Sequence, residues 1–109
     1  MNTAYATNEP VRAEVDKLEG PVVIEFGTDW CSFCQAAQPL ISTAFADHPQ
    51  VRYFKIEDGS GRRLGRSFGI KLWPTLVFLR GGKEMARLIR PRDVAAISAA
   101  LASIVVADS

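Results

Sequence analysis

One segment of the chain changes abruptly from the pattern of a buried strand to that of an amphipathic helix. Residues 22–26 are mostly apolar and β-branched, as in central strands that are buried on both faces. Glu25 is the one polar member of that run. After a polar turn, apolar residues recur at helical spacing, at Ala37, Leu40, Ile41, Ala44 and Phe45. Pro39 lies inside this helix, where a kink is expected.

Helical spacing marks three further segments. Residues 11–18 and residues 64–68 each form a short amphipathic pattern, and residues 94–105 form a longer one. Ser60 is the candidate N-cap of the second of these helices, and Asp93 is the candidate N-cap of the third.

Three other segments are typical of strands, at residues 51–56, 76–79 and 84–89, and Gly81 and Gly82 predict a hairpin turn between the last two. Strands separated by helices favour parallel pairing through right-handed crossovers, and a hairpin adds antiparallel pairing. The sequence therefore predicts an α/β fold with a mixed central sheet of four to five strands between helix layers.

Composition fits one globular domain spanning residues 1–109, because 48% of the residues are hydrophobic. No apolar run reaches the roughly 18 residues that a membrane span needs, and residues 1–10 show no secretory signal. We therefore expect a cytoplasmic protein without a membrane partner. Residues 62–92 hold nine Lys and Arg but only one acidic residue, Glu84. No nucleic-acid recognition motif accompanies this stretch, so a solvated basic face is favoured over nucleic-acid binding.

The two cysteines, Cys31 and Cys34, stand at i and i+3 where the helical pattern begins. Thiols at this spacing lie on one helix face, close enough to form a disulfide. Such a bridge closes a very small loop, so stabilisation is not its purpose. A helix N-terminus favours the thiolate form of Cys31, whereas Cys34 lies one turn deeper. We expect Cys31 to attack a substrate disulfide and Cys34 to resolve the mixed disulfide.

A zinc site is the alternative for this pair. Structural zinc takes four ligands, and the only other candidate of the usual kind is His48, which is predicted to lie at the far end of the helix. A zinc site would therefore need a symmetric dimer in which the two copies together supply four thiolates. No metal and no other cofactor are predicted.

Glu25 precedes Cys31 by six residues, in the strand that leads to the cysteines. A buried carboxylate is costly unless it has partners, so its position calls for an explanation. Beneath the cysteines it would accept the proton that Cys34 loses during resolution. The alternatives are that Glu25 points outward from a sheet edge, or that it pairs with Lys55 for structural reasons.

These motifs together resemble the thioredoxin family over nearly the whole chain. The likeness rests on the cysteine motif of residues 30–34, on Glu25 where the family has a buried Asp, on Pro39, and on Pro74 with its neighbours Trp73 and Thr75. The resemblance implies a thioredoxin fold, reduction of protein disulfides, and an electron donor similar to thioredoxin reductase. It also implies that Pro74 has a cis peptide bond and packs against the active-site cysteines.

Several positions depart from the family pattern. Ser32 and Phe33 separate the cysteines, where thioredoxins have Gly-Pro. Tyr53 aligns with a family Lys near the buried acid, so a helpful positive charge is expected to be missing. Arg90 and Pro91 replace a small, glycine-containing stretch of the substrate groove.

The departures predict an aromatic rim around the cysteines. Trp30, Phe33 and Trp73 are candidate substrate-binding residues, although Trp30 could instead pack against the helix start. Arg90 would stabilise the Cys31 thiolate or meet an acidic partner.

Two functions follow from these expectations. The first is a thiol–disulfide oxidoreductase with Cys31, Cys34, Glu25 and Pro74 in its catalytic site. The second is a binding or assembly module for one protein partner, in which the cysteines are a regulatory or vestigial switch. Replacing Cys31 by Ser separates the two, because only the first function needs the thiol.

Overall fold

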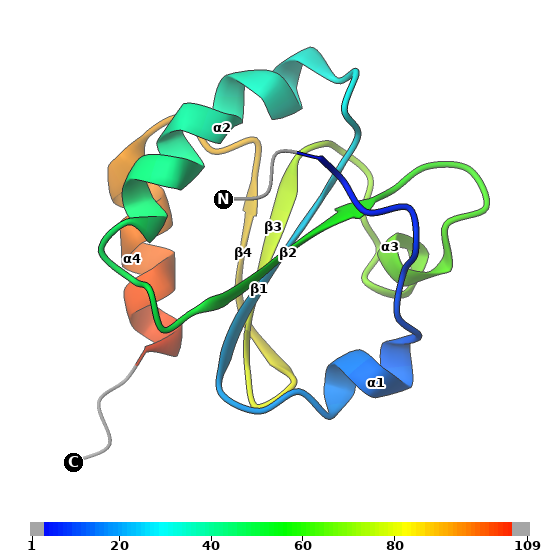
Figure 1. Cartoon of the computed structure of the whole chain (residues 1–109), viewed down its shortest axis with the longest axis horizontal. Coiled ribbons are helices and arrows are strands. Elements are labelled where there is room, and N and C mark those ends of the chain that lie inside the picture. Colours follow the sequence, from blue (N-terminus) through cyan, green and yellow to red (C-terminus); the bar gives the residue numbers. More distant parts are fainter. Residues whose placement is uncertain (1–3, 106–109) are drawn as a thin grey trace.

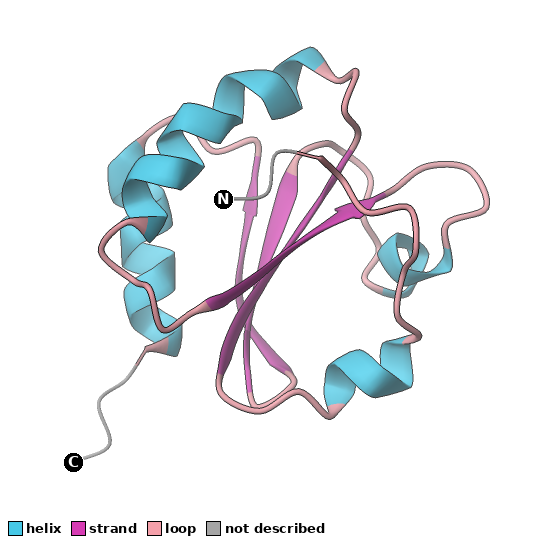
Figure 2. Ribbon diagram, viewed as in Figure 1, coloured by secondary structure: helices cyan, strands magenta, loops and turns pink. Residues whose placement is uncertain are grey.

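The computed structural model describes residues 4–105 (Figures 1 and 2). Helices and strands follow one another in the predicted order. The elements are α1 (Arg12–Asp16), β1 (Pro21–Gly27), α2 (Ser32–Phe45), β2 (Arg52–Glu57), α3 (Arg63–Ser67), β3 (Thr75–Arg80), β4 (Lys83–Ile89) and α4 (Val94–Ile104). The local periodicities therefore identified every element in this part of the chain.

The four strands form one mixed sheet in the order β2-β1-β3-β4. β1 pairs with β2 in parallel, as expected, and β3 and β4 form the predicted antiparallel hairpin. However, β3 lies antiparallel to β1, so parallel pairing of all helix-separated strands was wrong. The reason is the short length of α3. A parallel connection must carry the chain back along the whole length of a strand, but the five residues of α3 span only about 8 Å, well short of a six-residue strand. The chain thus enters β3 near the sheet end where it left β2.

Helices cover both faces of the sheet, and α2 and α4 lie together on one of them (Figure 2). Val23 and Leu76 pack on that face against Ile41, Ile97 and other core residues of these two helices. Consecutive side chains in a strand alternate between faces, so Glu25 shares the α2 face with Val23. This alternation places Glu25 under the helix that begins at the cysteines.

The amino-terminal segment adds a short fourth pairing, at the β2 edge of the sheet. Ala6 forms an isolated parallel bridge with Ile56, with hydrogen bonds from Ala6 N to Lys55 O and from Glu57 N to Ala6 O. The predicted count of four to five strands is therefore confirmed as four strands and this bridge. The bridge also fixes the neighbouring Tyr5, which is buried.

The N-terminus of α3 is capped from a distant segment. Its N-cap residue is Arg62, without a side-chain cap of its own, so the expectation that Ser60 caps this helix was wrong. The Glu9 carboxylate instead accepts hydrogen bonds from Arg63 N at 3.0 Å and from Leu64 N at 3.2 Å. A local sequence pattern holds no signal for a cap that arrives from 54 residues away.

Replacing Glu9 by Ala should destabilise the fold by about 1 kcal/mol, since it removes acceptors from two otherwise unpaired helix N–H groups. Urea unfolding measures the difference in the free energy of unfolding. Ser60→Ala is the matched control and should change that free energy by less than about 0.5 kcal/mol. Equal effects of the two variants would contradict the capping role of Glu9.

Candidate active site

The two cysteines differ in their exposure and contacts. Cys31 is the N-cap residue of α2, and its Sγ accepts a hydrogen bond from Cys34 N at 3.2 Å. Cys31 is 8% exposed to solvent and Cys34 only 1%, which confirms that Cys34 lies deeper. Both cysteines are free thiols in this structure. An N-cap sulfur that accepts a backbone N–H is suited to carry negative charge.

The environment of Cys34 keeps its thiol protonated. Burial, which is the largest effect, and a hydrogen bond with Cys31 raise the pKa of Cys34 to about 12. Because only a thiolate attacks a disulfide efficiently, Cys34 needs a proton acceptor at the moment it reacts.

The raised pKa predicts slow alkylation of Cys34 in a Cys31→Ser variant, because burial remains when Cys31 is gone. A thiol is protonated below its pKa, so the rate with iodoacetamide should still rise about tenfold per pH unit between pH 8 and pH 10. Measuring that rate by mass spectrometry checks the shift. A plateau near pH 9, the ordinary thiol value of 9.0, would contradict it.

Glu25 is fully buried in the central strand β1, so the alternative that it points outward from a sheet edge was wrong. Its carboxylate accepts hydrogen bonds from the hydroxyls of Tyr5 and Tyr53 and from Gln38 Nε2, the last at 2.9 Å. Buried polar groups are normally paired in this way, and donors of this kind stabilise a carboxylate.

A lysine belongs to this network. The expectation that no positive charge lies near Glu25, which rested on Tyr53 standing at the place of a family Lys, was therefore wrong. Lys55 is the register partner of Glu25 in the neighbouring strand, is buried, and donates from Nζ to Gln38 Oε1 at 2.9 Å. Alternate residues of a strand share one face, so Tyr53 and Lys55 both lie on the face of β2 that Glu25 shares. Gln38 therefore connects Lys55 with Glu25, since its Oε1 accepts from Lys55 and its Nε2 donates to Glu25.

Tyr5, Gln38 and Asp58 are site residues that the sequence analysis missed. Gln38 stands four residues after Cys34, so helical spacing could have placed it on the same face of α2. Asp58 follows the end of β2 and accepts from Trp73 Nε1 at 2.8 Å. No pattern connects Tyr5 with residues 20 or more positions away.

The loop before β3 brings Pro74 to the cysteines. The Trp73-Pro74 peptide bond is cis, and Pro74 is buried. The Trp73 carbonyl oxygen lies 4.0 Å from Cys31 Sγ and accepts a hydrogen bond from Arg90 Nε at 2.8 Å. Arg90 N also donates to the Pro74 carbonyl at 2.9 Å.

The Arg90 side chain contacts both this loop and the aromatic residue between the cysteines. Its guanidinium lies 3.9 Å from the centre of the Phe33 ring, in addition to its bond to Trp73. Its φ of 50° places a non-glycine residue in the left-handed region, which costs of the order of 1 kcal/mol. These contacts hold the guanidinium between Trp73 and Phe33.

Two aromatic side chains project beside Cys31 and form the predicted rim with Trp73. Trp30 is 74% exposed and Phe33 is 54% exposed. Trp30 packs edge-on against Trp73 with their ring centres 5.7 Å apart. An open groove of about 430 Å³ runs beside Phe33 between α2 and the loop of Arg90 to Arg92.

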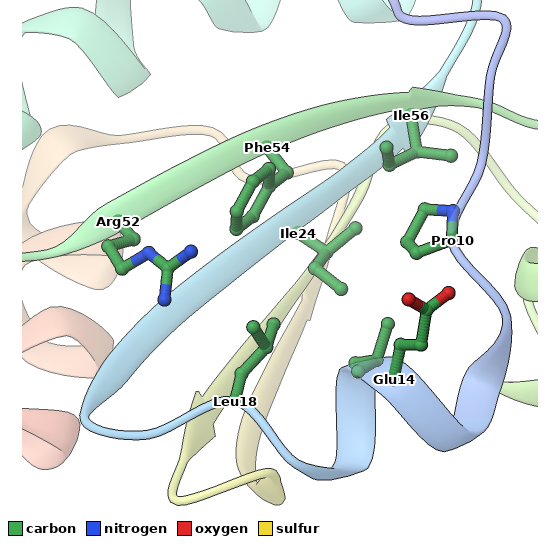
Figure 3. Close-up of a pocket in the computed structure, with 8 residues that line it drawn as sticks. Pro10, Glu14, Leu18, Ile24, Arg52, Phe54 and Ile56 are labelled. Atoms are coloured by element: carbon green, nitrogen blue, oxygen red, sulfur yellow. The ribbon is translucent and has the colours of Figure 1, made fainter.

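A second hollow lies on the opposite face of the sheet, between α1 and the edge strand β2 (Figure 3). Ile24, Leu18 and Phe54 line it. Because Ile24 neighbours Glu25 in β1, its side chain points away from the cysteines. This hollow therefore does not belong to the site.

Residues 4–105 contain no cluster of three or more His, Cys, Asp or Glu side chains arranged for a metal ion. His48 lies at the far end of α2, with Nδ1 at 3.2 Å from Ala44 O. Among the same residues, no helix has the length and apolar character of a membrane span.

Several cationic side chains of residues 62–92 form ion pairs, such as Arg62 with Glu57 and Arg87 with Glu84.

Comparison with known proteins gives a consistent result. The family model for thioredoxin matches residues 2–103. Thioredoxin 2 from Pseudomonas aeruginosa PAO1, solved in its reduced form, superposes with a TM-score of 0.86 at 55% identity, covering 95% of this chain and 96% of that one. Thioredoxin-2 of Saccharomyces cerevisiae is 31% identical over 91 residues, which are 84% of each chain. Thioredoxin from Chlamydia muridarum is 30% identical over 74 residues, covering 68% of this chain and 72% of its own.

The four-stranded mixed sheet between helices is thus a thioredoxin fold. Family and fold together support thiol–disulfide oxidoreductase activity in general, and the two cysteines lie next to each other. This chain is a member of the thioredoxin family.

Proposed function

We propose that this chain reduces or exchanges disulfides of other proteins through a Cys31/Cys34 dithiol–disulfide couple. The observation that supports this most is the asymmetry of the pair, in which Cys31 caps α2 and accepts a hydrogen bond while Cys34 is buried as a protonated thiol. Its electron donor would be an enzyme similar to thioredoxin reductase.

The reaction proceeds in two steps. The Cys31 thiolate attacks a substrate disulfide, forming a mixed disulfide and releasing the first substrate sulfur as a thiolate. Cys34 then attacks Cys31 Sγ, which forms the intramolecular disulfide and releases the second substrate sulfur. Glu25 accepts the proton that Cys34 loses, since its carboxylate is buried beneath the pair. The substrate gains two electrons and the cysteine pair loses two.

The groove residues hold the substrate segment in this proposal. The buried cis Pro74 and the Trp73 carbonyl, which Arg90 fixes, present backbone groups next to Cys31. Trp30 and Phe33 supply exposed aromatic surface on the other side of the thiol. An extended segment that contains the substrate disulfide would lie between them.

Catalysed reduction of insulin by dithiothreitol tests this function. The protein should accelerate the precipitation of the insulin B chain well above the rate with dithiothreitol alone. A rate equal to that of dithiothreitol alone would contradict protein-disulfide reduction.

A second candidate, a binding or assembly module, is favoured by the exposure of the aromatic rim. In that case a captured partner would remain bound to a Cys31→Ser variant with unchanged affinity.

A further inference from the structure

The Tyr5 side chain reaches the space between the buried cysteine and the buried acid. Its hydroxyl donates a hydrogen bond to Glu25 Oε2. Tyr5 also forms a buried cluster with Cys31 and Cys34, against which Trp73 packs. The Ala6 bridge and a hydrogen bond from Tyr5 N to Asp29 Oδ1 at 3.1 Å hold its backbone in place. The position is thus built by the fold and is not a chance contact of a chain end.

Gly27 shows how closely the thiol and the hydroxyl approach. A β-carbon at Gly27 would lie 2.6 Å from Cys34 Sγ and 2.8 Å from Tyr5 Oη. Both groups therefore occupy the space that a side chain at this position would need. The Tyr5 side chain and Cys34 also belong to one buried cluster, so the hydroxyl lies beside the thiol.

The hydrogen bonds around Glu25 define a route for the proton. Among the described residues, its carboxylate accepts hydrogen bonds from Tyr5, Tyr53 and Gln38. Of these donors, Tyr5 is the one whose hydroxyl lies beside Cys34 Sγ in the space next to Gly27. Burial and the neighbouring Glu25 raise the pKa of Tyr5, so its hydroxyl stays neutral and keeps a proton to donate.

We propose that the Tyr5 hydroxyl relays the proton from Cys34 to Glu25 when Cys34 resolves the mixed disulfide. The inference rests on the proposed oxidoreductase function. As the bond between Cys34 Sγ and Cys31 Sγ forms and the bond from Cys31 to the substrate sulfur breaks, the Cys34 proton passes to Tyr5 Oη. The Tyr5 proton passes at the same time to Glu25 Oε2. The substrate sulfur leaves with the electron pair, and Tyr5 ends neutral.

The two-step release of thionitrobenzoate from Ellman's reagent separates attack from resolution. Attack by Cys31 releases one thionitrobenzoate, and resolution by Cys34 releases the second. At high reagent concentration the first release is fast, whereas the second is independent of concentration. Stopped-flow absorbance at pH 7 therefore measures both rates on the intact protein.

Tyr5→Phe should slow the second release about 10- to 100-fold and change the first less than about twofold, because only resolution needs the relay. The deficit should shrink as pH rises, since hydroxide then removes the Cys34 proton directly. Tyr53→Phe is the matched control, because it also deletes a hydroxyl that donates to Glu25 but does not contact Cys34. It should slow the second release less than about threefold.

Equal slowing by the two variants would overturn the relay, since the effect would then come from Glu25 alone. A measurement on the unaltered protein avoids any folding defect of a variant. The rate of the second release in mixtures of H₂O and D₂O should curve with the deuterium fraction, because two protons move together. A straight line would overturn the relay. If the unaltered protein gives no second release at all, the proposed function fails instead.

Discussion

A Cys31→Ser variant should lose all catalysis of insulin reduction and react at the rate of dithiothreitol alone. Cys31 is the thiol at the N-terminus of α2, with its sulfur facing Cys34 N and the Trp73 carbonyl. Cys34 is almost fully buried and its pKa is raised to about 12, so it does not replace the missing nucleophile.

Cys34→Ser is the matched control for that experiment. It should also fail to turn over, but for the opposite reason, because Cys31 still attacks and the mixed disulfide then persists. Mass spectrometry without reductant should find one substrate molecule bound to Cys31 in this variant and none in Cys31→Ser. Substrate trapped on Cys34 in the Cys31→Ser variant would reverse the assigned roles.

The second large effect is expected at Gly27, the last residue of β1. Gly27→Ala should lower the free energy of unfolding by about 3 kcal/mol, because the added methyl group overlaps Cys34 Sγ and the Tyr5 hydroxyl in a buried site. Neither neighbour moves easily, since α2 fixes the cysteine and the Ala6 bridge fixes the tyrosine. Urea unfolding in reducing buffer measures the loss.

A double-mutant cycle separates this overlap from a general effect on the strand. Tyr5→Phe removes the overlapping hydroxyl but keeps the ring carbon Cζ, which would lie 2.9 Å from the added methyl group. The relief is therefore partial, and Gly27→Ala should cost less in that background by about 0.5 kcal/mol. Additive effects, or a loss below about 0.5 kcal/mol in the single Gly27→Ala variant, would contradict the packing described around Gly27.

The sequence predicted well what depends on local periodicity. The strand containing Glu25, the helix after Cys31 and the hairpin at Gly81 and Gly82 all stand where alternation and turn residues indicated. The Asp93 cap is also confirmed, with Asp93 Oδ1 accepting from Ala96 N at 2.8 Å. In each case the residues that determine the structure are neighbours in the chain.

The errors concern contacts between distant segments. The direction of β3 depends on how far the short helix α3 carries the chain, and the cap of α3 comes from Glu9 rather than Ser60. The partners of Glu25 depend on strand register, which sets Lys55 and Tyr53 on its face. Tyr5 reaches the site only because Ala6 pairs with the edge of β2. None of these contacts between distant segments is encoded in a local sequence pattern.

The measurement that tests the central claim most directly is the reduction potential of the Cys31/Cys34 pair. The protein is equilibrated in graded dithiothreitol and glutathione buffers, the thiols are quenched, and the free thiols are counted by mass. We predict one two-electron transition to an intramolecular disulfide, with a potential nearer about −270 mV than about −120 mV, because no His adjoins Cys31 to stabilise its thiolate strongly. If no intramolecular disulfide forms in any buffer, the oxidoreductase account is wrong.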